Sequence, residues 1–298
     1  MFKTGVCIIS RNDGYGGFLE ERASININSA LECFDYVYYI DWNSTTDLTL
    51  LEKIKDHIPK YKNIRQFKVS PQVATFLTKN QPAQKCCEVL ARNIGIRRMC
   101  DDGIDYIVSS NIDIINPSKK DMNRFVEKYM NDNLFCTVSR RDINLQWSSK
   151  TWQHNVENFY KKPVIENLRK NYYRYPCMPP NDEHYHAALI SYCGDFQIAH
   201  RNVWSKIKGF EESLLKRGYT DVNVQLKAYH AGVPLFVYYH LPVFHINHGL
   251  GGYGGNSDNH TLDKKKDFEY RHYVCTQLKL TSNSDNWGFP NLESIVEI

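Results

Sequence analysis

The sequence lacks several patterns that would each indicate a particular class of protein. Its nine cysteines include no CxxC pair, and their scattered, odd set favours free buried thiols over a zinc site or a disulfide framework. No apolar run approaches the ~18 residues of a membrane-spanning helix. The short apolar run near the start is cut off by Arg11, Asn12 and Asp13, which argues against a signal peptide. From these absences we expect a soluble, cytoplasmic protein with no transmembrane segment.

Strong charge of either sign and the usual phosphate-binding glycine motifs are also missing. The formal net charge is +4 over 298 residues, which is too small to indicate a nucleic-acid-binding protein but would suit an anionic small substrate. Gly14, Gly16 and Gly17 follow the first predicted strand without the GxGxxG or GxxxxGK spacing. This glycine-rich loop could cradle a phosphate or form a simple turn.

What the sequence does contain is an alternation of strand and helix patterns in its first part. Apolar, partly β-branched runs predict buried strands at 6–9, 36–40, 64–69 and 106–108. Helical spacing of apolar residues predicts helices at 19–34, 48–57 and 86–99, with a loop over 70–85. A strand, a helix and a second strand in succession predict a right-handed βαβ unit. We therefore expect a Rossmann-like, nucleotide-binding α/β half up to residue 117.

Polar residues directly follow several of these strands. Arg11 follows the first strand, Asp41 the second, and Asn111 and Asp113 the fourth. The carboxyl ends of parallel strands share one sheet edge, where open α/β sheets bind ligands. Asn111 and Asp113 are two residues apart and would point to the same side of a strand, where they could hold a hard cation and a sugar hydroxyl. Taken alone, the pair is more simply interpreted as a turn that ends the strand.

The middle of the chain has a different composition. After a predicted helix at 121–130 and a predicted strand at 135–139, residues 142–190 are rich in Trp, Tyr, Asn, His and Pro. Flat aromatic side chains on loops, such as Trp147, can stack on a sugar. Clusters of this kind also pack loops against a sheet, so both interpretations stay open.

Later segments carry longer motifs. Residues 192–212 contain the pattern G-x-F-x-x-x-x-R-x-x-W-x-x-I-x-G-F-E-E, and residues 218–232 read G-Y-T-D-V-N-V-Q-L-K-A-Y-H-A-G. Residues 243–248, V-F-H-I-N-H, follow an apolar run. These three segments resemble motifs of glycosyltransferases with the GT-A fold, including that family's E-D acid pair and its late histidine element.

Earlier features fit the same resemblance. Residues 91–95, A-R-N-I-G, resemble the A-R-N-x-G motif on the helix before the family's metal motif. The triplet 111–113 takes the place of the family's D-x-D, and residues 41–44 take that of an acidic, Ser-ended loop after strand two. The resemblance covers about residues 4–117 and 190–250, in the right order. The sequence most resembles the large inverting family typified by bacterial polysaccharide and galactosyl transferases.

The resemblance implies a fold and a domain organisation. The fold would be α/β of the GT-A type, with a Rossmann-like nucleotide-binding half and a mixed central sheet flanked by helices. A glycosyltransferase domain would span 1–258, with its nucleotide-binding half at 1–117 and its acceptor half at 118–258. A C-terminal helical extension would follow at 259–298, with a charged helix at 262–280 and Trp287 packed back onto the domain.

The resemblance also implies an activity. A sugar would move from a nucleotide-sugar, most plainly a UDP-sugar, to a hydroxyl of a glycan, protein or lipid, with inversion at the anomeric carbon. Mn²⁺ or Mg²⁺ would assist, held by Asp113 and by His245 or His248. Asp221, which matches the second acid of the E-D pair, would be the general base. The nucleotide would contact Arg11, Asp41, Ser44, Arg92 and Asn111, and the sugar or acceptor would contact Asp195, Trp147 and Thr220.

Some residues depart from the family pattern or have simpler interpretations. Asn111 stands where the family usually has Asp, and Thr220 where it has Glu. An inactive, nucleotide- or sugar-binding relative of the same fold is therefore the alternative. Asp221 could instead be the N-cap of a helix at 222–231, and Arg92 could simply pair with Glu88 four residues earlier.

Overall fold

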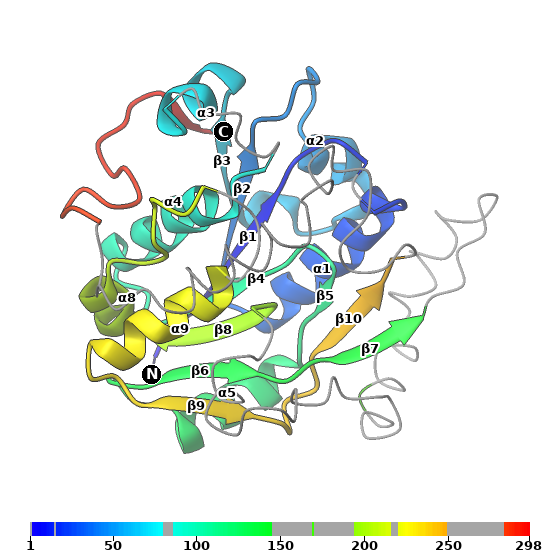
Figure 1. Ribbon diagram of the computed structural model, residues 1–298. Coiled ribbons are helices and arrows are strands. Elements are labelled where there is room, and N and C mark those ends of the chain that lie inside the picture. The colour runs from blue at the N-terminus through cyan, green and yellow to red at the C-terminus, as the bar shows by residue number, and fades with distance from the viewer. Residues whose placement is uncertain are drawn as a thin grey trace, which may run out of the picture.

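The computed structural model describes residues 2–14, 16–79, 86–144, 169, 194–215, 220–248 and 283–298. Within these ranges the chain forms an eight-stranded central sheet and a three-stranded second sheet, with helices on both faces of the central sheet (Figure 1). This is the mixed α/β architecture that the sequence predicts.

The centre of the large sheet is the predicted parallel unit. Its strands are β1 (Thr4–Ser10), β2 (Tyr36–Trp42), β3 (Ile64–Val69) and β4 (Tyr106–Ser110), in the spatial order β3-β2-β1-β4. The pairs β1–β2, β2–β3 and β1–β4 are parallel. The register sets Ser10 opposite Asp41 and Ile8 opposite Ser110. The segments after β1, β2 and β4 therefore leave the sheet at one edge, as expected.

Strands from the second half of the chain extend this sheet and make it mixed. β8 (Phe196–His200) lies antiparallel between β4 and β6 (Phe135–Val138), and β9 (Leu235–Tyr238) lies parallel to β6. β11 (Ile295–Glu297) adds to β3 in antiparallel orientation. Because β8 runs against β4, the start of β8 meets the end of β4, and this pairing brings the chain just before β8 to the predicted site.

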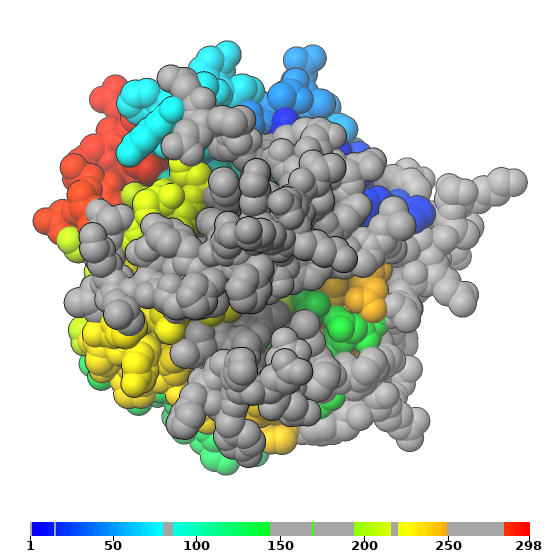
Figure 2. All heavy atoms as spheres, viewed as in Figure 1, coloured from blue at the N-terminus to red at the C-terminus, as the bar shows by residue number. Residues whose placement is uncertain are grey.

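The second sheet is small and consists of three strands in the order β5-β10-β7. These are β5 (Ile114–Ile115), β10 (Phe244–Asn247) and β7 (Arg141–Asn144). β10 pairs antiparallel with β5 and parallel with β7. In Figure 2, the orange atoms of the β10 region lie beside the green atoms of the β5–β7 region at the molecular surface. Segments more than a hundred residues apart in the sequence therefore meet here.

Helices cover the two faces of the large sheet. One face buries apolar side chains of α1 (Leu19–Cys33), α2 (Leu50–Ile54) and α5 (Lys119–Tyr129). The other buries those of α4 (Glu88–Asp101), α8 (Arg201–Ile207) and α9 (Thr220–His230), with α3 (Pro71–Leu77). In α4, a Cβ on Gly95 would collide with the Cys7 sulfur of β1. The bare glycine lets α4 approach the sheet closely and so brings Arg92, one turn earlier, to the end of β4.

Two local predictions need correction. The predicted helix at 48–57 is α-helical only over α2 and continues as a 3₁₀ turn, Lys55–His57, with a second one at Tyr61–Asn63. The predicted loop at 70–85 contains α3, because the Ser70 hydroxyl accepts a hydrogen bond from the Val73 N–H and Pro71 fits the first helical turn.

The described part of the tail packs as expected. Trp287 is 3% exposed, and the Arg97 guanidinium lies 5.3 Å from its ring centroid. The predicted helix at 262–280 lies outside the described residues. In the described ranges, no helix has the length and apolarity needed to cross a membrane.

Candidate functional site

Asp113 lies where the two sheets meet. β4 ends at Ser110, the turn 111–113 follows, and β5 then pairs with β10 so that Ile114 stands opposite His245. Asn26 of α1 fixes this turn, because its side-chain amide donates to the carbonyls of Asn111 (3.0 Å) and Ile114 (2.7 Å). The backbone itself thus places Asp113 beside the histidine-bearing strand.

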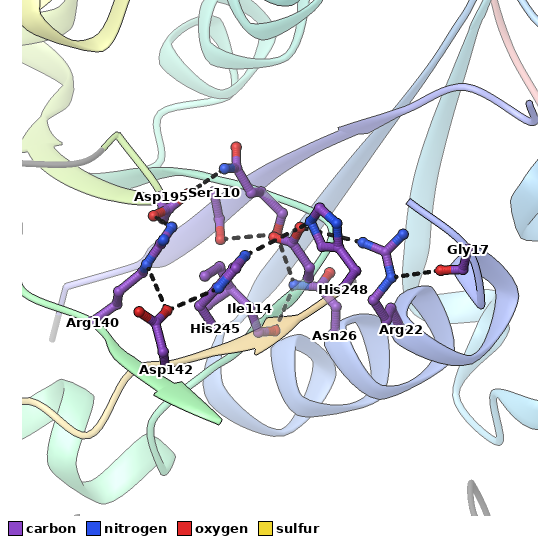
Figure 3. A network of polar contacts seen from close by, with 12 residues as sticks. Gly17, Arg22, Asn26, Ser110, Ile114, Arg140, Asp142, Asp195, His245 and His248 are labelled. Atoms are coloured by element: carbon purple, nitrogen blue, oxygen red, sulfur yellow. Dashed lines mark hydrogen bonds and ion pairs between the residues drawn. The ribbon is translucent and has the colours of Figure 1, made fainter. Parts of the chain in front are cut away.

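His245 and His248 lie close to each other (Figure 3). Both face the Asp113 carboxylate. The Nε2 atom of His248 lies 3.1 Å from Asp113 Oδ2, and that of His245 lies 3.6 Å from the same oxygen. One ligand atom from each of the three residues lies within 4.8 Å of the others. The other carboxylate oxygen, Asp113 Oδ1, is buried and has no hydrogen-bond partner among the described residues. The three predicted metal ligands therefore come together with an oxygen to spare.

A fourth group, Arg22 of α1, approaches the same carboxylate. Its Nη1 lies 3.3 Å from Asp113 Oδ2, and its Nε donates to the Gly17 carbonyl at 3.1 Å. Burial would raise the pKa of Asp113, but the two imidazoles and the Arg22 charge hold it well below its usual range. Asp113 is therefore a permanent anion at neutral pH.

Asp142 of β7 holds the far side of His245. Its Oδ1 lies 3.0 Å from His245 Nδ1, which leaves Nε2 to face Asp113. Burial lowers the pKa of His245, but its two carboxylate partners outweigh this and raise it to about 9. A metal bound to Nε2 would therefore displace a proton. Carboxylates in this position commonly orient metal-binding histidines.

Arg140 links this centre to the start of β8. Its Nε lies 3.2 Å from Asp142 Oδ1, and its Nη1 forms an ion pair with Asp195 Oδ2. Asp195 is buried, and its other oxygen accepts a hydrogen bond from the Asn111 amide. Asp195 therefore joins the turn after β4 to the second sheet, and its predicted contact with the sugar or acceptor stays a prediction.

The side chains of Asn111 and Asp113 contact different groups, contrary to the expectation that both point to the same side of a strand. The chain leaves the strand conformation after Ser110, so the alternation of side chains no longer applies. Asn111 Oδ1 accepts from Arg92 Nη2, and its Nδ2 donates to Asp195. Arg92 also donates to the Ser109 hydroxyl at 2.5 Å, so its guanidinium supports this turn from within α4.

The other predicted nucleotide contacts gather after β1 and β2. Asp41 is fully buried; its Oδ1 accepts from the Ser44 hydroxyl at 2.7 Å, and none of the described residues donates to its Oδ2. Burial raises the pKa of Asp41 to about 6. Arg11 donates through Nε to the Asn43 carbonyl at 2.8 Å, and its Nη1 lies 3.5 Å from Asp13.

Asp221 lies within α9 and is not its N-cap. The helix begins by Thr220, and Asp221 Oδ2 accepts a hydrogen bond from the Gly194 N–H, outside the helix, at 2.8 Å. A Cβ on Gly194 would collide with the Asp221 side chain, so the glycine permits this contact. Burial, with the nearby Asp195 charge, raises the pKa of Asp221. Thr220 is buried at the helix start, and Trp147 lies outside the described residues.

Sequence reasoning missed three residues of this network. Arg22, Arg140 and Asp142 all touch the predicted ligands or their partners, yet no motif contains them. Their positions depend on where α1 and β7 dock, which residue spacing does not reveal. The signal that could have pointed to Arg22 is a lone basic residue among the apolar positions of the helix at 19–34.

Comparisons with known proteins bear on the fold. No protein-family model matches this chain, and no curated protein matches it by sequence. GalNAc-T7, solved with UDP, GalNAc and Mn²⁺, is 13% identical with a TM-score of 0.50, over 86% of this chain and 46% of that one. A TM-score of 0.50 is sufficient to assign the fold of this chain. The chain has the GT-A fold.

Two further solved structures are similar at lower scores. Residues 1–349 of TarS from S. aureus are 13% identical with a TM-score of 0.49, over 82% of this chain and 60% of that one. The mannosyltransferase PcManGT from Pyrobaculum calidifontis, solved with GDP-Man and Mn²⁺, is 10% identical with a TM-score of 0.45, over 84% of this chain and 58% of that one. This chain spans less than two thirds of each of the three proteins.

Proposed function

We propose that this protein is a glycosyltransferase that moves a sugar from a UDP-sugar to a hydroxyl group, with inversion and with the help of a divalent metal. The observation that carries the proposal is the convergence of Asp113, His245 and His248 at the ligand-binding edge of a GT-A fold. The pairing of β5 with β10 brings the turn that carries Asp113 next to the segment with the two histidines, and the spare oxygen of Asp113 suits a cation.

The chemistry of these donors favours Mn²⁺ over Mg²⁺. One carboxylate and two imidazoles form a mixed oxygen and nitrogen set, whereas Mg²⁺ prefers oxygen ligands and retained waters. A divalent cation bound there would supply positive charge to the diphosphate as it leaves. Asp142 would keep His245 in the orientation and tautomer that ligation requires.

Asp41 is the proposed contact for the base. The uracil N3–H is a donor, and Asp41 Oδ2 is a buried acceptor that no described residue uses. Ser44 orients the carboxylate, and Arg11 lies at the end of the neighbouring strand. Arg92 would act indirectly, since its guanidinium already holds Asn111 and Ser109.

Asp221 is the proposed general base. As the acceptor oxygen bonds to the anomeric carbon, the bond from that carbon to the diphosphate breaks, and Asp221 takes the hydroxyl proton. Its raised pKa makes it a better proton acceptor than an ordinary aspartate. The Gly194 N–H holds the Asp221 carboxylate beside the start of β8.

The alternative, an inactive nucleotide-binding relative, rests mainly on Asn111. The contacts of Asn111 argue against a substitution that has inactivated the site, because the side-chain amide of Asn111 bridges Arg92 and Asp195. An aspartate at position 111 could accept from Arg92 but would place two carboxylates against each other at Asp195. The asparagine is therefore matched to this network.

Donor turnover tests the proposal. UDP-glucose, UDP-galactose and UDP-GlcNAc would be incubated with the protein, with and without Mn²⁺, and released UDP and the product anomer measured. We expect Mn²⁺-dependent release of UDP from at least one donor and an inverted anomeric configuration in any transfer product. UDP-induced thermal stabilisation without turnover would support the inactive relative. Absence of both turnover and stabilisation would contradict the proposed function.

A further inference from the structure

One face of the central sheet changes from apolar to polar as it approaches the candidate site. Three cross-strand neighbours on β4, β8 and β6 belong to one apolar core cluster: Ile107, Ala199 and Phe135. Two residues nearer the ligand-binding edge, and so on the same face, the register aligns three polar residues: Ser109, Gln197 and Thr137. These polar residues are at most 1% exposed. A buried polar row therefore crosses three strands of the sheet.

Gln197 is the member of this row that reaches a helix. Its Nε2 donates a hydrogen bond to the main-chain carbonyl of Asp221, in the first turn of α9, at 3.0 Å. None of the described residues donates to its other polar atom, Oε1, which is buried. Burying an amide is costly unless both of its polar atoms are hydrogen-bonded. Because an apolar side chain would fill this space at lower cost, packing alone does not account for a glutamine here.

Asp221 is bound to the β8 segment through both its main chain and its side chain. Gln197 holds the Asp221 carbonyl, and the Gly194 N–H donates to Asp221 Oδ2 at 2.8 Å. A Cβ on Gly194 would lie 2.2 Å from the Asp221 Cβ, so the two segments are in close contact. In Figure 1, α9 lies beside β8. A shift of the first turn of α9 away from β8 would therefore move the Asp221 carboxylate away from Gly194.

A second amide on the same carbonyl offers a comparison within the molecule. Gln225 Nε2 donates to the Asp221 carbonyl at 3.1 Å, and Gln225 is 1% exposed, so its burial matches that of Gln197. Gln225 lies in α9 itself, one turn after Asp221. Its bond to the carbonyl stays within the helix and does not fix α9 relative to the sheet. Of these two bonds, the one from Gln197 joins the helix to β8.

We propose that Gln197 is a positioning residue, which fixes the first turn of α9 against β8 and so sets the position of the Asp221 carboxylate. The inference deepens the proposed function and rests on it, because Asp221 is the proposed general base. A base must lie within hydrogen-bond reach of the hydroxyl that it deprotonates, and a displacement of about 1 Å lowers a rate by up to about 100-fold. Loss of the Gln197 bond therefore slows transfer and leaves donor binding unchanged.

The test compares Gln197→Met with Gln225→Met, since each replaces a buried amide by an apolar side chain of similar length. UDP release from UDP-glucose, UDP-galactose and UDP-GlcNAc with Mn²⁺ gives kcat and KM, and nuclear magnetic resonance gives the hydrogen-exchange rate of the Gly194 amide. We expect Gln197→Met to lower kcat about tenfold, to keep the donor KM within about twofold, and to speed Gly194 exchange about tenfold. Gln225→Met should stay close to wild type in all three.

Thermal unfolding separates positioning from a general loss of structure. Gln197→Met removes the buried Oε1 together with the donor, so its unfolding temperature should stay close to that of wild type while kcat falls. Gln197→Leu is a second apolar replacement that should behave in the same way, and it serves if the methionine variant does not fold.

The outcomes also separate this inference from the proposed function. A folded Gln197→Met with wild-type kcat and wild-type Gly194 exchange would overturn the role of Gln197 and leave Asp221 as the base. Equal losses of kcat in Gln197→Met and Gln225→Met would overturn it too, because the carbonyl rather than the link to β8 would then matter. If wild type released no UDP from any of the three donors, the proposed function would fail, and Gly194 exchange would then decide the link between α9 and β8 alone.

Discussion

Two buried aspartates at one edge of the sheet have opposite electrostatic properties. Asp41, after β2, has a hydroxyl partner in Ser44, no ion pair within the described part of the chain, and a pKa raised to about 6. Asp113, after β4, faces Arg22 and two imidazoles, and its pKa lies well below the usual range. Both residues are at most 5% exposed, so burial alone cannot explain the difference in pKa.

The contrast indicates different ligands for the two ends of the site. A carboxylate without a cation is suited to accept a hydrogen bond from a neutral donor such as a nucleobase. A carboxylate among basic groups is suited to exchange one cation for another. Under the proposed function, the carboxylate after β2 would accept a hydrogen bond from the base, and the carboxylate after β4 would hold the cation that binds the diphosphate.

The largest effect on activity is expected at a third carboxylate, Asp221, which is the proposed general base. Burial raises its pKa, as it does for Asp41. Asp221→Asn should lower transfer by about 100- to 10,000-fold, the range that a general base supplies, and leave UDP affinity unchanged. Initial rates and UDP titrations would be compared with those of Asp285→Asn, a control at an exposed position. Retained activity would show that another group takes the proton.

Next in size is the effect of Asp41→Asn on stability. The pKa of Asp41 rises from 3.8 to about 6 on folding, so the folded protein binds more protons and the free energy of unfolding falls as pH rises through this window. Well above pH 6, where Asp41 is ionised, the loss in free energy of unfolding is complete and is on the order of 3 kcal/mol at most. Asp41→Asn should therefore be more stable than wild type at pH 7.5, with a smaller gain at pH 5, and should bind UDP more weakly.

Chemical denaturation at several pH values measures this effect, and Asp113→Asn is the matched comparison. Because the pKa of Asp113 is lowered, its ionised form stabilises the fold at neutral pH, and its replacement should destabilise the protein there. Shifts of the same sign in the two variants at pH 7.5 would contradict the electrostatic contrast between the two aspartates.

A smaller effect is expected from the residue that orients His245. Asp142→Asn should weaken Mn²⁺ binding about 10- to 100-fold, as for other partners of metal-ligating histidines, and leave UDP affinity without metal unchanged. Isothermal titration of Mn²⁺ in the presence of UDP would be the measurement. Unchanged Mn²⁺ affinity would mean that His245 is not a ligand.

The smallest effect compares two glycines with the same backbone angle. Gly14 and Gly16 both have φ +71°, but a Cβ at Gly14 would meet nothing within 4 Å, whereas one at Gly16 would meet His248. Both alanine variants should lose about 1–2 kcal/mol of stability from the left-handed conformation. Only Gly16→Ala should also weaken Mn²⁺ binding, by several-fold. Equal Mn²⁺ affinities would mean that the glycine-rich loop does not support the metal centre.

Much of the fold could be predicted from the sequence because its signals are local. The runs at 6–9 and 36–40 identified parallel strands, and this placed Arg11 and Asp41 on one edge, as the register of Ser10 and Asp41 confirms. The short helix α3 could have been expected from Ser70 and Pro71, but its 7 residues are too few to show a clear helical period. Strands of two to four residues, such as β5, β7 and β10, carry almost no periodic signal.

The candidate site was only partly predictable, for a related reason. Motif order suggested Asp113, His245 and His248, and the structure places them together. Contacts between distant segments, such as Arg22 with Asp113 and Asp142 with His245, depend on tertiary docking. The divergence of Asn111 from Asp113 depends on where β4 stops, and strand ends are set by hydrogen-bond partners that one segment does not reveal.

A crystal structure with UDP and Mn²⁺ tests the central claim most directly. We expect one Mn²⁺ ion bound by Asp113, His245 and His248 and by the diphosphate, with the uracil at Asp41. Mn²⁺ bound to the diphosphate without any of these three side chains, or a uracil placed away from Asp41, would contradict it.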